Sequence, residues 1–187
     1  MKINRCGWCE GDNLYEAYHD KEWGVPVKDD ATLFEFLVLE TFQAGLSWIT
    51  ILKKRENFKK AFDGFDYKKI AQYDQHKIKD LLDNAGIIRN KLKVNATVSN
   101  AKAFMEVQST FGSFSNYYWG FVNNTPIKNR VENYKEAPGK TPLSDLVSKD
   151  LKKRGFKFVG STVIYAMMQA TGMVNDHEIS CFRYEEV

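Results

Sequence analysis

The sequence lacks the features that mark membrane, disulfide-stapled and repetitive proteins. It has no apolar run of about 18 residues, which excludes an ordinary transmembrane helix, and its opening residues include no apolar signal segment. Its three cysteines are an odd number and too few for a disulfide framework, which leaves metal binding or free thiols. No repeat or low-complexity tract is present. These absences predict a cytoplasmic globular protein.

A large excess of positive charge is also missing. Lys and Arg number 27 against 24 Asp and Glu, a net charge of +3, far below that of a protein that coats DNA non-specifically. A polyanionic partner would therefore have to bind a local basic cluster. The chain does have a hydrophobic fraction of 43 % and an aromatic fraction of 14 %. These fractions predict a core for a single domain over residues 1–187.

Apolar residues at helical spacing, together with capping residues, predict an all-α protein of about nine or ten helices. In the helix expected over 32–44, Asp30 is the predicted N-cap, and Glu40 shares a face with Leu33 and Phe36. Residues 111–138 are the least regular, and no strand pair with a hairpin turn stands out. Further helices are expected over 47–62, 74–86, 89–107, 142–154 and 162–171, with Ser47, Asp74, Thr141 and Ser161 as N-caps.

Most of the aromatic residues are expected to form the core. Asp20 and Glu22 are expected to be solvated or to cap a helix, and His76 to lie on the surface of an amphipathic helix. The predicted core aromatics are Phe34, Phe36, Phe42, Phe58, Phe62 and Phe65, followed by Tyr117, Tyr118 and Trp119.

Five Cys and His residues near the two ends of the chain are candidate metal ligands. Cys6 and Cys9 form a C-x-x-C pair, and His177 and Cys181 are four residues apart, so one helical turn would point them the same way. His19 completes the set, and zinc prefers thiolate and imidazole ligands. The spacing leaves two alternatives open, namely free cysteines with surface histidines, and a redox motif. No βαβ pattern surrounds the C-x-x-C pair to support the redox motif.

A basic segment flanked by glycines, KKRGFKFVG over 152–160, connects the last two predicted helices. Backbone N–H groups beside glycines and at helix N-termini bind phosphate, and lysines add positive charge. The segment therefore predicts a helix-hairpin-helix DNA-binding element over about 143–171. An ordinary helical pair with a solvated basic face is the alternative. The predicted DNA contacts are Lys153, Gly155, Lys157, Gly160 and Ser161.

Six segments together carry a resemblance to a known family. They are RCGW (5–8), YHDKEWGVP (18–26), QAGLSW (43–48), GIIR (86–89), KKRGFKFVG (152–160) and VNDH (174–177). In this order they closely resemble the 3-methyladenine DNA glycosylase I family, a constitutive, zinc-containing branch of the helix-hairpin-helix DNA glycosylase superfamily. The resemblance extends from Arg5 to Cys181.

The resemblance implies one structural zinc ion per chain, which clamps the N-terminal segment to the C-terminal segment. The family's ligands map onto Cys6, His19, His177 and Cys181. Cys9 is not in that set, so the resemblance conflicts with the C-x-x-C pair, and we follow the family pattern. The resemblance also implies two helical lobes with an active-site cleft between them.

A pocket for the damaged base is implied as well. The resemblance places the base-recognition carboxylate at Glu40, with Tyr18 and Trp48 as stacking or edge contacts, and we predict Glu40 as the catalytic residue as well. A carboxylate on an apolar face is costly unless it is paired, and adenine methylated at N3 is a cation that carboxylates and aromatic faces attract. A buried ion pair with Lys or Arg is the alternative. Trp8, Tyr15 and Trp23 lie in or beside the same motifs and are predicted to complete the pocket.

Two departures from the superfamily pattern bear on the reaction. The superfamily commonly has a catalytic aspartate two residues before a histidine, where this chain has Asn175, and Asp176 is one residue too late. The lysine of the lyase members would fall near Thr162. The resemblance therefore implies a monofunctional enzyme that hydrolyses the base–sugar bond of 3-methyladenine and leaves an abasic site. Without the usual aspartate, the reaction would depend on the lability of the cationic base.

We expect double-stranded DNA containing 3-methyladenine as the partner, no membrane, no obligatory protein partner, and a monomer. Two alternatives stay open. One is a zinc-stabilised DNA-binding module without glycosylase activity, and the other is a glycosylase for a different alkylated purine, because selectivity depends on differences as small as a methyl group.

Overall fold

The computed structural model describes residues 3–187, so the first two residues of the predicted domain lie outside the described residues. The described residues form nine α-helices, three short 3-10 helices and two strands of two residues each. The α-helices are α1 (Asn13–Lys21), α2 (Asp30–Gln43), α3 (Trp48–Ala61), α4 (Tyr67–Ile70), α5 (Gln75–Asp83), α6 (Lys91–Phe111), α7 (Phe114–Gly120), α8 (Pro142–Lys153) and α9 (Ser161–Ala170). The remaining elements are η1 (Asp63–Phe65), β1 (Ile127–Lys128), η2 (Tyr134–Glu136), β2 (Val174–Asn175) and η3 (Phe182–Glu185).

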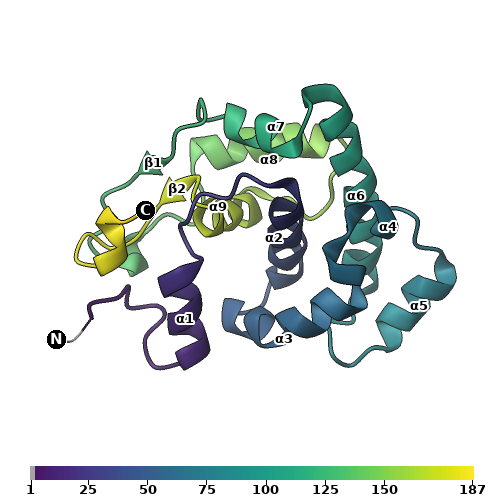
Figure 1. The fold of residues 1–187 in the computed structure, drawn as a ribbon, viewed down its shortest axis with the longest axis horizontal. Coiled ribbons are helices and arrows are strands. Elements are labelled where there is room, and N and C mark those ends of the chain that lie inside the picture. The colour runs from purple at the N-terminus through teal and green to yellow at the C-terminus, as the bar shows by residue number, and fades with distance from the viewer. Residues whose placement is uncertain (1–2) are drawn as a thin grey trace.

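Helix α2 lies at the centre of the fold, with α9 beside it and α3, α6 and α7 around it (Figure 1). Its residues from Leu33 to Phe42 are buried, apart from the half-buried Glu35. A helix that is apolar nearly all round is stable only when neighbouring elements cover every side. The one carboxylate among these buried residues, Glu40, is therefore held in the interior by the packing of α2.

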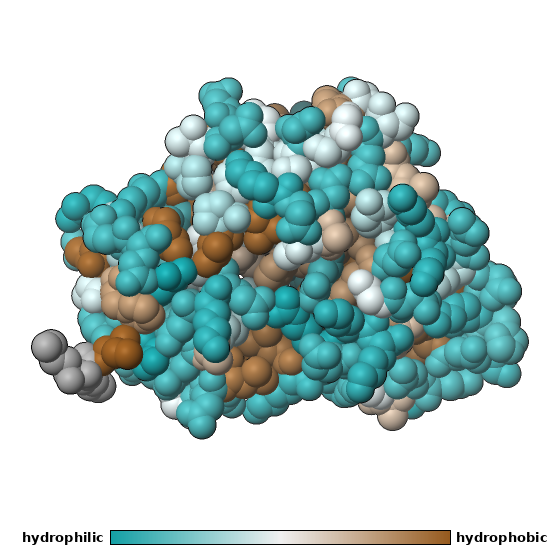
Figure 2. Space-filling view, in the orientation of Figure 1, coloured by the Kyte–Doolittle hydropathy of each residue, from teal (hydrophilic) through white to brown (hydrophobic). Residues whose placement is uncertain are grey.

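The main core extends from Leu33 on α2 to Val174 on β2. All nine aromatics predicted to be core are buried, with at most 5 % of each side chain exposed. His76 lies on the surface as predicted, where it faces Asp80 one turn away. A second, smaller cluster joins Tyr18, Phe36, Leu52 and Ala170, with tryptophans packed against it. The surface is mostly hydrophilic on the face seen in Figure 2.

The predicted start of α2 was wrong by one residue. Asp29 is the N-cap, since its side chain accepts a hydrogen bond from the N–H of Thr32 at 2.8 Å. The Asp30 carboxylate instead accepts from the N–H groups of Phe114 and Ser115, both at 2.8 Å. Asp30 therefore ties α2 to the first turn of α7, a contact between residues more than 80 positions apart.

The other predicted caps had mixed outcomes. Asp74 and Thr141 cap α5 and α8 as expected, and Thr141 forms a capping box with Ser144. Ser47 stands at the N-cap of α3, but its hydroxyl bonds to the Thr50 hydroxyl instead of the backbone. At α9 the prediction was wrong, because Gly160 is the N-cap and Ser161 is the first helical residue. The short helices α1, α4 and α7 lie outside the predicted helical ranges.

The two strands form a small parallel pair between β1 and β2. The pairing attaches the irregular segment after α7 to the C-terminal segment, and Val131 extends it by a bridge to Glu178. The N- and C-terminal segments lie on this same side of the molecule (Figure 1). Among the described residues, no helix is long and apolar enough to cross a membrane.

Candidate metal site and base pocket

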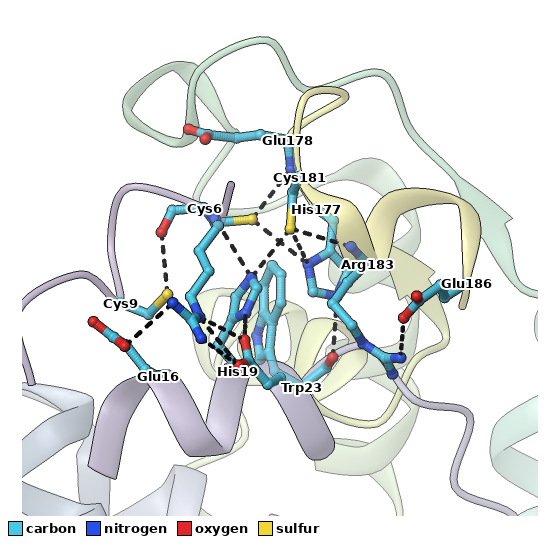
Figure 3. Close-up of polar contacts among 12 residues, drawn as sticks. Cys6, Cys9, Glu16, His19, Trp23, His177, Glu178, Cys181, Arg183 and Glu186 are labelled. Carbon is cyan, nitrogen blue, oxygen red and sulfur yellow. Dashed lines mark hydrogen bonds and ion pairs between the residues drawn. The ribbon is translucent and has the colours of Figure 1, made fainter. Parts of the chain in front are cut away.

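Four buried Cys and His side chains meet where the two ends of the chain come together (Figure 3). The Sγ of Cys6 lies 3.5 Å from Nδ1 of His177, and the Sγ of Cys181 lies 3.4 Å from Nε2 of His19 and 3.7 Å from the same Nδ1. A tetrahedral zinc ion with ordinary bond lengths separates sulfur and nitrogen ligands by about 3.6 Å. The four side chains therefore have the donor set and spacing of a closed zinc site.

The second nitrogen of each imidazole has a hydrogen-bond partner. Nδ1 of His19 lies 2.9 Å from a carboxylate oxygen of Asp20, and Nε2 of His177 lies 3.1 Å from the carbonyl oxygen of Trp23. These partners accept the ring N–H and leave the other nitrogen free to bind a cation, as the outer contacts of metal sites do. A Cβ on Gly24 would stand 2.8 Å from His177, so the chain needs glycine there.

Asp20 is more than the solvated or capping residue expected from sequence. Its carboxylate also accepts from the guanidinium of Arg5, at 2.9 Å from Nε and 2.8 Å from NH2. The Arg5 hydrogen bond, reinforced by His19, lowers the pKa of Asp20. An ionised Asp20 is a strong acceptor, so it fixes the ring orientation of His19. Glu22, the other residue in that expectation, pairs with Arg55.

The two thiol sulfurs receive backbone hydrogen bonds. The N–H of Glu178 points to Cys6 at 3.3 Å, and the N–H of Arg183 points to Cys181 at 3.4 Å. Cys9 takes no part in the cluster, because its thiol donates to the carbonyl oxygen of Cys6 at 3.1 Å. The C-x-x-C pair suggested by spacing is thus not a ligand pair, and the set mapped from the family resemblance is the one that converges.

A pocket of about 240 Å³ lies beside this cluster. Pockets for drug-sized ligands are larger, about 300–1,000 Å³, so this volume suits a single small ring system. The pocket is bounded by α1, α2, α3, α9 and the segment around η2. All six predicted base-binding residues line it, namely Trp8, Tyr15, Tyr18, Trp23, Glu40 and Trp48.

Three buried polar atoms of this pocket have no hydrogen-bond partner among residues 3–187. They are Oε2 of Glu40, the hydroxyl of Tyr18 and Nε1 of Trp48. Burial alone raises the pKa of Glu40 to about 8, and burial raises the pKa of Tyr18 well above its usual value. For the described residues the alternative of a buried ion pair is wrong, because no salt bridge among them joins Glu40 to a Lys or Arg. Unpaired buried polar groups are costly, so these atoms indicate a polar ligand.

The metal cluster and the pocket share two tryptophans. The Trp23 ring meets His177 edge-on with centroids 4.6 Å apart, and the Trp8 ring lies 5.4 Å from His19 and 5.0 Å from Trp23. Closing the two chain ends at the cluster thus also sets the positions of two pocket rings.

Sequence analysis missed half of the pocket wall. Gln43 stands in a quoted motif but received no role, and Tyr134 and Ala137 lie in the segment judged least regular. Tyr134 is brought to the pocket by its N–H, which donates to Glu178 at 2.8 Å. No local signal could reveal such a contact between distant segments. The other missed residues are Ala166, Gln169 and Asp176.

The predicted DNA contacts all lie in or next to the connection between α8 and α9. The side chains of Lys153 and Lys157 are exposed, and Gly155 adopts a φ of +93°, which L side chains rarely adopt. Asn100 on α6 holds the loop through both backbone groups of Lys157, accepting at 2.7 Å and donating at 3.0 Å. Helix α6 therefore anchors the loop, and the lysine side chains of the loop extend into solvent.

The chain was compared with known proteins. The model of the family described as methyladenine glycosylase matches residues 8–184. DNA-3-methyladenine glycosylase 1 of Escherichia coli K12 is 48 % identical over 182 residues, which cover 97 % of each chain. A crystal structure of 3-methyladenine DNA glycosylase I superposes with a TM-score of 0.93 at 49 % identity, over 96 % of this chain and 98 % of that one. A variant of 3-methyladenine DNA glycosylase I in complex with 3-methyladenine is also similar, with a TM-score of 0.93 at 34 % identity and coverage of 96 % and 97 %.

Proposed function

Because the chain belongs to the methyladenine glycosylase family, we propose that it excises 3-methyladenine from alkylated double-stranded DNA and leaves an abasic site. The observation that carries this proposal is the aromatic pocket with a buried, unpaired carboxyl group. The similar structure with 3-methyladenine bound supports the same substrate. Since a base inside a duplex is out of reach, the damaged nucleotide has to swing out before it can enter the pocket.

Recognition of the base rests on the unpaired atoms of the pocket. The carboxyl of Glu40 and the hydroxyl of Tyr18 bond to the edge of the base, and the rings of Trp8, Trp23 and Trp48 surround it. Methylation at N3 makes the base cationic, and both the Glu40 carboxylate and the aromatic faces favour a cation. Ordinary adenine is neutral and lacks this attraction.

The reaction is hydrolysis without a covalent enzyme intermediate. The base is already a good leaving group, so positioning and electrostatic stabilisation carry the rate enhancement. Thr162, at the position of the lyase lysine, offers no amine for a Schiff base. Base release should therefore occur without strand cleavage.

Two further elements complete the proposal. Residues of about 143–171 form a helix-hairpin-helix, where Lys153, Lys157 and the backbone of Gly155, Gly160 and Ser161 anchor DNA phosphates. Cys6, His19, His177 and Cys181 hold one structural zinc ion, which supplies folding stability and leaves no position for water. The whole chain then acts as one glycosylase domain, with the pocket in a cleft between two helical lobes.

The proposal is tested by incubating the protein with methylated duplex DNA and identifying the released bases by chromatography. We expect 3-methyladenine to be released and 7-methylguanine to be retained. Glu40→Gln should slow release by roughly 10²-fold, the effect typical of losing one key electrostatic group. The matched control is Glu56→Gln on the exposed face of α3, which should keep the wild-type rate.

Three other outcomes would change the proposal. DNA binding without any base release would favour a non-catalytic binding module. Release of another alkylated purine in place of 3-methyladenine would keep the reaction and change the substrate. Release of uracil at a comparable rate would contradict the dependence on a cationic base.

A further inference from the structure

Asp176 is a second buried carboxylate in the wall of the base pocket. Only 3 % of the residue is exposed, and it lines both the pocket and an adjoining depression formed by residues 129–133 and 136–138 with Thr141 and Tyr165. It thus stands between the enclosed pocket and an outer hollow. Its position in the sequence, one residue after Asn175, had indicated no role in the reaction.

The direction of the chain at β2 explains this placement. Asn175 faces the C-terminal segment, where its Nδ2 donates to the carbonyl oxygens of Tyr184 and Val187, both at 3.0 Å. Successive residues of an extended strand point to opposite sides. The next residue, Asp176, follows β2 directly and lines the pocket. The sequence has Asn175, not aspartate, two residues before His177, so no aspartate was expected at the catalytic position of the superfamily. In the structure, the neighbouring Asp176 provides a carboxylate in the pocket wall.

Three donors hold the Asp176 carboxylate in a single orientation. Nδ2 of Asn129 donates to Oδ1 at 2.7 Å, and the hydroxyl of Tyr165 and Nε2 of Gln169 donate to Oδ2 at 2.5 and 2.9 Å. No Lys or Arg pairs with it among the salt bridges of the described residues. The carboxylate is therefore held in place without a cationic partner among these residues, and a group preorganised in this way needs no reorganisation during a reaction.

Asp176 and Glu40 border the same pocket from different parts of the chain. Helix α9 carries the proposed phosphate anchor at Ser161 and, about 12 Å further along its axis, the pocket residue Gln169, which binds Asp176. Glu40 approaches the pocket from α2. In the proposed binding mode, the base contacts Glu40 and the sugar lies beside Asp176, which lines the same pocket.

We infer that Asp176, acting in the proposed glycosylase reaction, stabilises the positive charge that develops on the sugar. As the bond between C1′ and the base nitrogen breaks, its electron pair leaves with the base. The cationic base departs neutral and the sugar becomes the cation. A water oxygen then bonds to C1′ and its proton passes to solvent. The anionic carboxylate takes no proton and forms no bond, and it acts through its charge.

The first test compares Asp176→Asn with Tyr165→Phe. Both change the contact between Tyr165 and Asp176, but only the first removes the charge. Under single-turnover conditions with enzyme in excess, Asp176→Asn should slow release of 3-methyladenine on the order of 10²-fold. Tyr165→Phe should stay within about threefold of wild type, and the affinity of both variants for free, neutral 3-methyladenine should be nearly unchanged. Equal slowing by the two substitutions, or an unchanged rate in Asp176→Asn, would overturn the inference.

A second pair of variants keeps the test decisive if Asp176→Asn fails to fold. Asn129 is partly exposed in the outer hollow, so Asn129→Lys brings a cation to Oδ1, whereas Asn129→Met loses the same donor without adding charge. We expect the lysine variant to release base about tenfold more slowly than the methionine variant at saturating enzyme. Equal rates would refute a role for the charge. A wild-type protein that releases no base at all would refute the proposed function instead, which separates the two failures.

Discussion

The Cys/His cluster and the aromatic pocket beside it are neighbouring groups of buried polar side chains, and they differ in how many of their polar atoms have hydrogen-bond partners. In the cluster, each imidazole nitrogen and each ligand sulfur contacts another ligand, a carboxylate or a backbone group. In the pocket, Glu40, Tyr18 and Trp48 each keep an atom with no partner in the described part of the chain. A paired set of this kind stabilises the fold, and an unpaired one costs stability until a ligand binds. The predictions below exploit this difference.

The largest effect is expected from breaking the cluster. Cys181→Ala should lose the bound metal, because three ligands remain. Metal binding contributes on the order of 10 kcal/mol to folding in small zinc domains, so we expect about 5 kcal/mol or more of lost stability and a melting temperature lower by roughly 10–20 °C. Elemental analysis and calorimetry measure both quantities.

Cys9→Ala is the matched control for this prediction. Cys9 is equally buried but lies outside the cluster. The Cys9→Ala variant should keep its metal, and its free energy of unfolding should fall by about 1 kcal/mol. Full metal content in the Cys181 variant would show that the cluster does not hold the ion.

In the pocket, Glu40→Gln should raise stability in a way that depends on pH. The pKa of Glu40 is about 8 in the folded protein against 4.5 as the ordinary value. Between these values the folded chain holds a proton that the unfolded chain has lost, so wild-type stability falls as pH rises through this window. Glutamine does not titrate, so the advantage of the variant should grow by about 1.4 kcal/mol per pH unit within the window and level off above it.

Urea unfolding at about pH 5, 6.5 and 8 measures this advantage through its linear extrapolation. Glu56→Gln, on the exposed face of α3, should show no such growth. A difference between wild type and Glu40→Gln that stays constant over the three pH values would contradict the raised pKa.

A smaller effect is expected at Tyr18, where one substitution should raise the stability of the free protein and lower its affinity for the base. Tyr18→Phe removes a buried hydroxyl that has no partner among the residues the structure describes, so the free protein should gain about 1 kcal/mol of stability, while binding of 3-methyladenine weakens roughly tenfold or less. The matched control is Tyr118→Phe, whose hydroxyl lies 3.1 Å from that of Thr171. The Tyr118→Phe variant should lose about 1 kcal/mol of stability and keep its affinity for 3-methyladenine. Calorimetry and fluorescence titration would distinguish the two variants.

The smallest effect is expected at the exposed lysine side chains of the α8–α9 connection. Lys157→Ala should weaken binding to any duplex sequence alike and reduce the slope of log affinity against log salt by about 1. Lys60→Ala on α3 serves as the exposed control and should leave the slope unchanged. Sequence-dependent loss of affinity in Lys157→Ala would be evidence against phosphate anchoring.

Sequence reasoning succeeded where the determining contacts are local. Asp74 and Thr141 cap their helices through groups only three residues away, so a short window of sequence contains both partners. It failed at Asp30, whose carboxylate is taken by backbone groups of α7 that no window around α2 includes. The same limit explains why α9 begins one residue earlier than its serine suggested. The Ser161 hydroxyl lies 2.7 Å from that of Ser144 on α8.

The sequence by itself determined the helical class, the family, the four cluster residues and six of the pocket residues, because recurrent motifs name residue types at set positions. Only the tertiary structure decided that Cys9 turns away from the cluster, that Tyr134 and Gln169 close the pocket, and that Asp176 faces it while Asn175 does not. The physical reason is that such orientations depend on the direction of the chain and on partners from distant segments. Those partners meet only after the two ends of the chain have come together.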